Sequence, residues 1–261
     1  MKKSLSSILL AALLLLTACG GGQPASPAPT EGGTLRVLCT TYPVYLFTTA
    51  VTKGVDGVQV DLLVQGQISC LHDYTLTVND MKAIEAADVI VMNGVGLEDF
   101  MSDALSQSAA SVIDCAQGLE LLPYEGHEEH DHRAGEEEGE HYDPHIWMAP
   151  GNAERMLQTI AEALAVVDPS HLDPYRSNSG TAVKEIQSGI QPDGDALAAL
   201  PGLITFHDGF QYFAQAFGLE LLKAIEEEEG SEASAAEIRE IVSLVEEHHI
   251  PAIFTEKNGS D

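Results

Sequence analysis

The sequence predicts an α/β protein with a mainly parallel β-sheet. Short apolar segments rich in Val, Ile and Leu have the length of buried strands, and segments with the apolar spacing of helices separate them. The first part of the chain contains expected strands at 34–41, 58–64, 88–93 and 111–114, with helices at 43–52, 77–87 and 97–108. This alternation favours parallel strands covered by helices on both faces, with ligands bound beyond the carboxyl ends of the strands.

Local signals support the individual elements. Thr77 is followed three residues later by Asp80, which is typical of a helix that begins with side-chain caps. Helices are then expected at 152–167 and 170–188, the second continuing less regularly past Pro192 to residue 200. A further run has strands at 203–206, 219–224 and 252–255, with helices at 210–217 and 235–248. From Thr34 onward the chain is long enough for two small α/β domains.

The N-terminus carries a targeting segment rather than part of the fold. Residues 1–18 combine two early lysines with an apolar run too short to span a bilayer, as a signal peptide does. The sequence Leu-Thr-Ala-Cys19 resembles the bacterial lipoprotein processing box, which implies cleavage before Cys19 and lipidation of its sulfur. The alternative is an ordinary signal peptide with a chance cysteine. Residues 19–33 are expected to be a flexible tether, so we expect a lipid-anchored protein on the outer face of the bacterial cytoplasmic membrane or in the periplasm.

The composition is strongly acidic. Only 12 Lys and Arg stand against 41 Asp and Glu, giving a formal net charge of −29. Nucleic acid and anionic lipid headgroups would be repelled, which excludes them as direct partners and leaves the lipid anchor as the membrane contact. An acidic surface attracts cations, although it is also a common route to solubility.

Three widely separated histidines lie near carboxylates. His72, His145 and His207 each have an aspartate beside them or two residues before them, namely Asp73, Asp143 and Asp208. Neutral imidazole is a common zinc ligand, and a neighbouring carboxylate orients the ring through its second nitrogen. The three histidines are predicted to form one metal site, whereas His171, His248 and His249 are expected at the surface. The alternative for the aspartates, Asp208 above all, is helix capping.

Residues 125–143 interrupt the regular pattern. This segment contains nine acidic residues and four histidines, with no apolar periodicity, and is expected to be a disordered surface loop. The histidines are His127, His130, His132 and His141. A solvated charge run needs no histidines, so a weak, rapidly exchanging metal-collecting role is predicted for the loop.

Three cysteines remain besides Cys19, in a compartment that permits disulfides. Cys39 ends the first expected strand and Cys70 follows the second, so a Cys39–Cys70 disulfide is predicted and Cys115 stays unpaired. The alternative is Cys70 as a thiolate ligand beside His72.

With these residues placed, the chain resembles the zinc/manganese-binding receptors of bacterial ABC importers, over essentially the whole body. The segments that carry the resemblance are His72-Asp-Tyr before a capped helix, Asp-Pro-His145-Ile-Trp and Thr-Phe-His207-Asp. Their order, the lipoprotein box and the His/acid loop together make it specific. The resemblance implies that His72, His145 and His207 are the metal ligands. A histidine at the third position, where manganese members usually carry glutamate, favours zinc over manganese, in agreement with the preference of imidazole.

The resemblance also implies an architecture and partners. Two α/β lobes, 34–168 and 201–261, would be joined by a long linking helix at 169–200, with the metal between the lobes. The protein would be a monomer that delivers Zn²⁺ to a membrane permease driven by an ATPase. Members of this family normally continue for some tens of residues beyond the position of Asp261, so the C-terminal lobe is expected to be truncated. The fourth ligand would then be water, Cys70 or a carboxylate; Glu256 is a weak candidate.

Two other functional classes are possible from the sequence. A zinc hydrolase would also use three protein ligands and an open position, but no H-E-x-x-H or G-x-S-x-G motif is present. The protein is therefore expected not to be an enzyme. An adhesin lipoprotein on the same scaffold is the second alternative.

Overall fold

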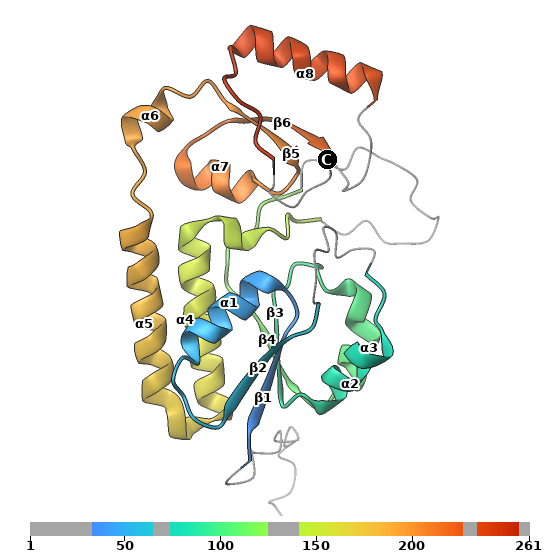
Figure 1. The fold of residues 1–261 in the computed structure, drawn as a ribbon, viewed down its shortest axis with the longest axis vertical. Helices are drawn as coiled ribbons and strands as arrows, with labels where there is room; N and C mark the ends of the chain where they lie inside the picture. Colours follow the sequence, from blue (N-terminus) through green and yellow to red (C-terminus); the bar gives the residue numbers. More distant parts are fainter. Residues whose placement is uncertain (1–32, 65–73, 125–140, 227–233, 256–261) are drawn as a thin grey trace, which may run out of the picture.

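The structure is a computed structural model that describes residues 33–64, 74–124, 141–226 and 234–255. It has two α/β lobes stacked end to end, with helices α4 and α5 running along one side of the first lobe (Figure 1). Within the described residues, no helix is both long enough and apolar enough to cross a membrane.

The first lobe is built on a parallel four-stranded sheet with the strand order β2-β1-β3-β4. The strands are β1 (Leu35–Cys39), β2 (Val58–Leu62), β3 (Val89–Met92) and β4 (Ser111–Asp114). Val37 of β1 pairs with Val60 on one side and Val89 on the other, so β1 and β3 form the centre of the sheet. The β-branched, apolar character of β1 and β3 suits central strands that are buried on both faces, whereas the edge strands β2 and β4 include polar, exposed residues.

Helices cover both faces of this sheet, as predicted for an α/β fold. The larger core lies against α1 (Tyr42–Val51), α4 (Pro150–Val167) and α5 (Leu172–Gly189). The smaller core lies against α2 (Val78–Ala86) and α3 (Ser102–Gln107). Alternate residues of β1 separate the two cores: Val37 and Cys39 face the first, and Leu38 faces the second.

The segment expected to be one linking helix is divided. A 3-10 turn, η3 (Pro169–His171), leads into α5, which ends at Gly189, and a separate helix α6 (Gly194–Ala198) follows. Pro192 lies in the break, where its ring and its missing N–H prevent a continuous helix. Asp193 begins α6 because its side chain accepts hydrogen bonds from the backbone N–H groups of Asp195 and Ala196.

The second lobe contains the parallel pair β5 (Leu203–His207) and β6 (Leu221–Glu226), with α7 (Gln211–Phe217) and α8 (Ala235–His248). Ser234 and Glu237 cap α8 reciprocally. The strand predicted at 252–255 is present only in part. Phe254 forms a parallel bridge to Thr205 of β5, in which Phe206 N–H donates to Phe254 O at 2.8 Å and Phe254 N–H donates to Ile204 O at 3.0 Å. Pro251 lies at the start of this segment and offers no N–H for a ladder.

Two boundaries in the first lobe also differ from the prediction. The helix expected from residue 97 begins as the 3-10 turn η1 (Asp99–Met101) and becomes regular only in α3, because Gly94 to Gly96 adopt positive φ angles and delay it. Residues 141–143, expected inside the disordered loop, pair with 122–124 through Tyr124 N–H to His141 O and Asp143 N–H to Leu122 O, each 2.9 Å. Residues 125–140 of that loop lie outside the described residues.

Cys39 does not form the predicted disulfide. It is a fully buried free thiol in the larger core, as is Cys115. Burial raises the pKa of Cys39 to about 12, so the thiol stays protonated and unreactive. Cys70 lies outside the described residues.

Candidate metal centre

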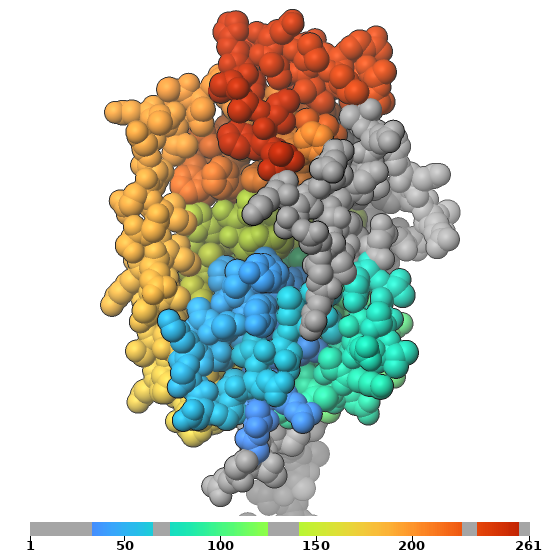
Figure 2. Space-filling view, in the orientation of Figure 1, coloured from blue at the N-terminus to red at the C-terminus, as the bar shows by residue number. Residues whose placement is uncertain are grey.

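His145 lies where the chain passes from the first lobe toward the second. It directly precedes the short 3-10 helix η2 (Ile146–Met148), which contacts both α4 and α7. This segment is yellow-green in the space-filling view, between the blue-to-cyan body of the first lobe and the orange-to-red second lobe (Figure 2).

Asp143 holds the His145 ring in one orientation. One carboxylate oxygen, Oδ1, accepts the backbone N–H of His145 at 2.8 Å and lies 2.7 Å from its Nδ1. Asp143 is fully buried, and the His145 side chain is 15% exposed. A ring that donates through Nδ1 carries its lone pair on Nε2, which is the form that binds metal.

The Nε2 atom of His145 faces a histidine from the other lobe. His207 is the last residue of β5, at the carboxyl end of the strand, as predicted. The two Nε2 atoms are 3.0 Å apart, and the rings are nearly perpendicular, at 79°. The structure thus brings together two of the three predicted ligands, although they are 62 residues apart in the sequence.

This separation suits one shared ion. At a Zn–N distance of ~2.05 Å, nitrogens 3.0 Å apart subtend an angle of ~94° at the ion, against ~109° and a nitrogen separation of ~3.3 Å in a regular tetrahedron. An outward movement of only ~0.3 Å therefore gives the regular geometry. With His145 Nδ1 donating to Asp143, His145 Nε2 is the acceptor of this contact and His207 Nε2–H is the donor, so metal capture must remove the proton from His207 Nε2.

Comparison with known proteins identifies the family. Residues 37–261 match the family described as ZnuA, zinc-uptake complex component A, periplasmic. The chain belongs to the ZnuA family. It is 31% identical to the high-affinity zinc uptake system protein ZnuA of Bacillus subtilis, over 97% of this chain and 80% of the relative. It is 30% identical to the zinc-binding lipoprotein AdcA of Streptococcus pneumoniae over 97% of this chain, which spans only 50% of AdcA.

Solved structures of ZnuA-family proteins share the fold. A crystal structure of ZnuA superposes with a TM-score of 0.72 at 30% identity, covering 87% of this chain and 84% of that one. Zn(II)-bound AdcA from Streptococcus pneumoniae superposes with a TM-score of 0.71 at 26% identity, covering 88% of this chain and 47% of AdcA. These matches confirm the predicted α/β lobes and the predicted resemblance to the zinc branch of metal-binding receptors.

The first predicted ligand, His72, lies outside the described residues with Asp73 and Cys70. The next described residue is Tyr74, whose hydroxyl donates to Asp80 Oδ2 at 2.9 Å. Thr77 and Asp80 cap α2 reciprocally, which confirms the predicted helix start. Burial opposes ionisation of Asp80, but hydrogen bonds from Thr77 and Tyr74 outweigh it and hold its pKa below the usual value. The hydrogen bond to Asp80 thus anchors the chain at Tyr74, two residues after His72.

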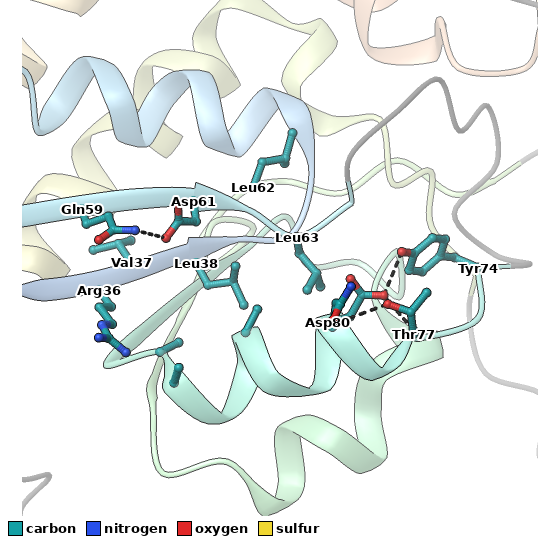
Figure 3. A pocket seen from close by; sticks show the side chains of 14 residues that line it. Arg36, Val37, Leu38, Gln59, Asp61, Leu62, Leu63, Tyr74, Thr77 and Asp80 are labelled. Atoms are coloured by element: carbon teal, nitrogen blue, oxygen red, sulfur yellow. Dashed lines mark hydrogen bonds between the residues drawn. The ribbon is translucent and has the colours of Figure 1, made fainter.

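A cavity of about 520 Å³ opens beside this anchor, between the first two strands and α2 (Figure 3). Tyr74, Thr77 and Asp80 lie at one end of it, and Gln59 and Asp61 lie on β2. Gln59 Nε2 donates to Asp61 Oδ2 at 2.8 Å. Neither His145 nor His207 lines this cavity, so it is separate from the histidine pair.

Other predicted residues do not join the pair. Within the described parts of the chain, no three His, Cys, Asp or Glu side chains are grouped to hold one ion. Asp208 is buried and lines a second cavity of about 460 Å³ with Leu122 and Gln211. His141 is exposed, while His127, His130, His132, Cys19 and Glu256 lie outside the described residues. His171, which was expected at the surface and not at the metal site, is partly exposed, and its Nδ1 lies 2.6 Å from Asp168 Oδ2.

Three residues outside the predicted ligand set lie close to the His145 segment. Tyr212 of α7 is buried, and its hydroxyl accepts the backbone N–H of Leu122 at 3.0 Å, which ties the second lobe to the first. Burial raises the pKa of Tyr212, and the nearby Asp143 charge adds to this. Asn93 and Glu98 form a buried polar network at the end of β3. No local pattern signals Glu98, since it is followed directly by a second acidic residue, Asp99.

Proposed function

We propose that this protein is an extracytoplasmic, lipid-anchored receptor that captures Zn²⁺ and delivers it to the permease of an ABC importer. The observation that carries the proposal is the 3.0 Å approach of His145 Nε2 and His207 Nε2, one from each lobe. His72 is the proposed third protein ligand, because its His-Asp-Tyr segment before a capped helix resembles the first ligand segment of the zinc-binding receptors.

Zinc is the favoured ion for two reasons. Imidazole nitrogen suits zinc, whereas oxygen-rich shells suit manganese. The family description names zinc uptake, and the relatives described above are a zinc uptake protein and a zinc-binding lipoprotein, AdcA, which has been solved with Zn(II) bound. The same family character favours a solute receptor over a hydrolase or an adhesin.

The anchor and the partner follow from other features. Cys19 ends a lipoprotein-like box, and two or more acyl chains on one residue give lasting membrane attachment. The family description, a periplasmic component of a zinc-uptake complex, supports a membrane permease and its ATPase as partners of a monomeric receptor. We retain the domain limits expected from the sequence, with lobes at 34–168 and 201–261, and propose that the metal binds between these two lobes.

The decisive experiment is zinc titration of the metal-free protein against a chromophoric chelator of known affinity. His72→Ala, His145→Ala and His207→Ala should each weaken zinc binding by orders of magnitude, because each removes one of few ligands. His248→Ala is the control, since this histidine lies in the last turn of α8, and it should leave the affinity unchanged. Wild-type affinity in all three alanine variants would refute the proposed site.

The same titration tests metal preference. With Zn²⁺ and Mn²⁺ supplied together, zinc should occupy the wild-type protein. Preferential retention of manganese would overturn the assignment of the ion while leaving the ligands intact.

The His/acid loop is proposed to collect ions weakly before they reach the tight site. Its flanks are already joined, since Tyr124 N–H donates to His141 O at 2.9 Å, so residues 125–140 can be replaced by a short Gly/Ser turn. This replacement should lower the number of weakly bound zinc ions and leave the tight site unchanged. Loss of the tight site would contradict the division of roles.

A further inference from the structure

The turn that follows β3 is built from unfavourable backbone conformations. Gly94, Val95 and Gly96 have φ angles of +90°, +60° and +76°. A Cβ on Gly94 would collide with the Asp114 carboxylate, so glycine is required there. A β-branched residue such as Val95 rarely adopts a positive φ, and its conformation costs ~1–3 kcal/mol. Such strain persists only where the surroundings enforce it.

Glu98 enforces it with a buried carboxylate. Its Oε1 accepts the backbone N–H of Asn93 and the hydroxyl of Thr40, both at 2.7 Å, and its Oε2 accepts the N–H of Gly94 at 3.0 Å. Glu98 is only 2% exposed. These bonds join the carboxyl ends of β1 and β3, the edge of the sheet that lies nearest the second lobe (Figure 1).

The turn directs the Asn93 side chain toward the segment that contains His145. Asn93 is fully buried, and its Nδ2 donates to Gly94 O at 3.1 Å and to Pro144 O at 2.9 Å. Since both acceptors are carbonyl oxygens, the amide can face them only with its NH₂ group. Pro144 directly precedes His145, so this bond crosses from the sheet edge to the backbone of a metal ligand.

His145 is therefore held at two points. Asp143 fixes the ring through Nδ1, and Asn93 fixes the peptide that leads into the residue. Burial raises the pKa of Glu98, and its three hydrogen bonds only partly offset this. Asn93 Oδ1 is buried without a hydrogen-bond partner among the described residues. Strain, a buried carboxylate and an unpaired amide oxygen are each destabilising, which is expected where a fold serves a site rather than stability.

We propose that Asn93 is a positioning residue for the metal ligand His145 and that Glu98 holds Asn93 in place. This inference deepens the proposed function and rests on it. Residues that orient a metal ligand from outside the ligand set typically contribute ~10–100-fold to metal affinity, and the same effect is expected here.

The test is Asn93→Ala, compared with Asn178→Ala. Asn178 is a matched control, because its Nδ2 also donates to two backbone carbonyls, Val51 O and Lys53 O, both at 2.9 Å. Each variant loses two hydrogen bonds from a side-chain amide to backbone carbonyls, but of the two residues only Asn93 contacts the His145 segment. We expect Asn93→Ala to weaken zinc binding ~10–100-fold and Asn178→Ala to leave it unchanged, each measured beside the urea-unfolding free energy of the metal-free protein.

A second readout does not depend on zinc. The ¹⁵N chemical shifts of the His145 ring in the metal-free protein report which nitrogen carries the proton, and His145→Gln assigns them. Asn93→Ala should shift or broaden these signals, and Asn178→Ala should not. If Asn93→Ala fails to fold, Glu98→Gln takes its place, since the glutamine amide cannot accept both the Asn93 and Gly94 N–H groups along with the Thr40 hydroxyl.

The outcomes separate the two proposals. Unchanged ring signals, or equal affinity losses in the Asn93 and Asn178 variants, would overturn the positioning role. A wild-type protein that binds no zinc, with His145 signals still altered by Asn93→Ala, would refute the proposed function and support the positioning of the ring.

Discussion

Gly209 offers a way to disturb the histidine pair without removing a ligand. A Cβ added to Gly209 would lie 2.8 Å from His207 Cδ2 and 3.0 Å from both Cδ2 and Nε2 of His145. Ordinary contacts between such atoms begin near ~3.5 Å, so the rings must move by ~0.5–0.7 Å. Metal sites tolerate only ~0.2 Å in ligand distance. We therefore expect Gly209→Ala to weaken zinc binding at least ~10-fold, or ~1.4 kcal/mol.

The assay is the chelator competition titration, accompanied by urea unfolding of the metal-free protein. The φ angle of Gly209 is not in the left-handed range, so alanine should be tolerated by the backbone. Gly180→Ala is the control, because its Cβ would meet nothing within 4 Å on helix α5. That variant should bind zinc normally and gain ~0.5–1 kcal/mol of stability. Wild-type zinc affinity in Gly209→Ala would refute a site between these two rings.

Three further changes test how the fold supports the site. Thr77→Ala removes one half of the α2 cap and should lower the unfolding free energy by ~0.5–2 kcal/mol in urea; unchanged stability would contradict the cap. Tyr212→Phe leaves the Leu122 N–H without its acceptor and should lower it by ~1–3 kcal/mol, whereas a neutral effect would disprove this tie between the lobes. The pKa of Asp168 is lower than its usual value. Burial alone would raise it, but hydrogen bonds from neighbouring side chains outweigh this effect. The stabilisation from Asp168 is thus present above pH ~4 and lost as the pH falls through the lowered pKa. Asp168→Asn should flatten the acid dependence of stability, and an identical pH profile would argue against it.

Much of the fold could be predicted because its signals are local. The strand at 111–114 and the helix at 235–248 agree with the structure residue for residue, since apolar runs and flanking caps lie within a few positions of each other. The α2 cap was predicted from two residues three apart. The strand expected at 252–255 is reduced to one parallel bridge between Phe254 and β5, because the extent of pairing depends on a distant partner strand that local sequence does not specify.

The site could be predicted only in outline. His145 and His207 were predicted as partners from residue type, neighbouring aspartates and resemblance, and the structure brings them together. Asn93 and Glu98 were missed because their partners Pro144 and Thr40 lie 51 and 58 residues away in the sequence. A periodic pattern contains no signal for such contacts, which form only when distant parts of the chain fold together.

The Cys39 prediction failed for a related reason. Proximity of two strand ends suggested a disulfide, but side chains alternate between the two faces of a strand. Cys39 points into the larger core with Val37, where burial keeps it a free thiol.

The most direct measurement is a crystal structure of the zinc-loaded protein with an anomalous difference map at the zinc edge. The account predicts one strong peak ~2.0–2.1 Å from both His145 Nε2 and His207 Nε2, bridging the lobes. A tight zinc ion bound elsewhere, or a peak that touches only one of these nitrogens, would contradict it.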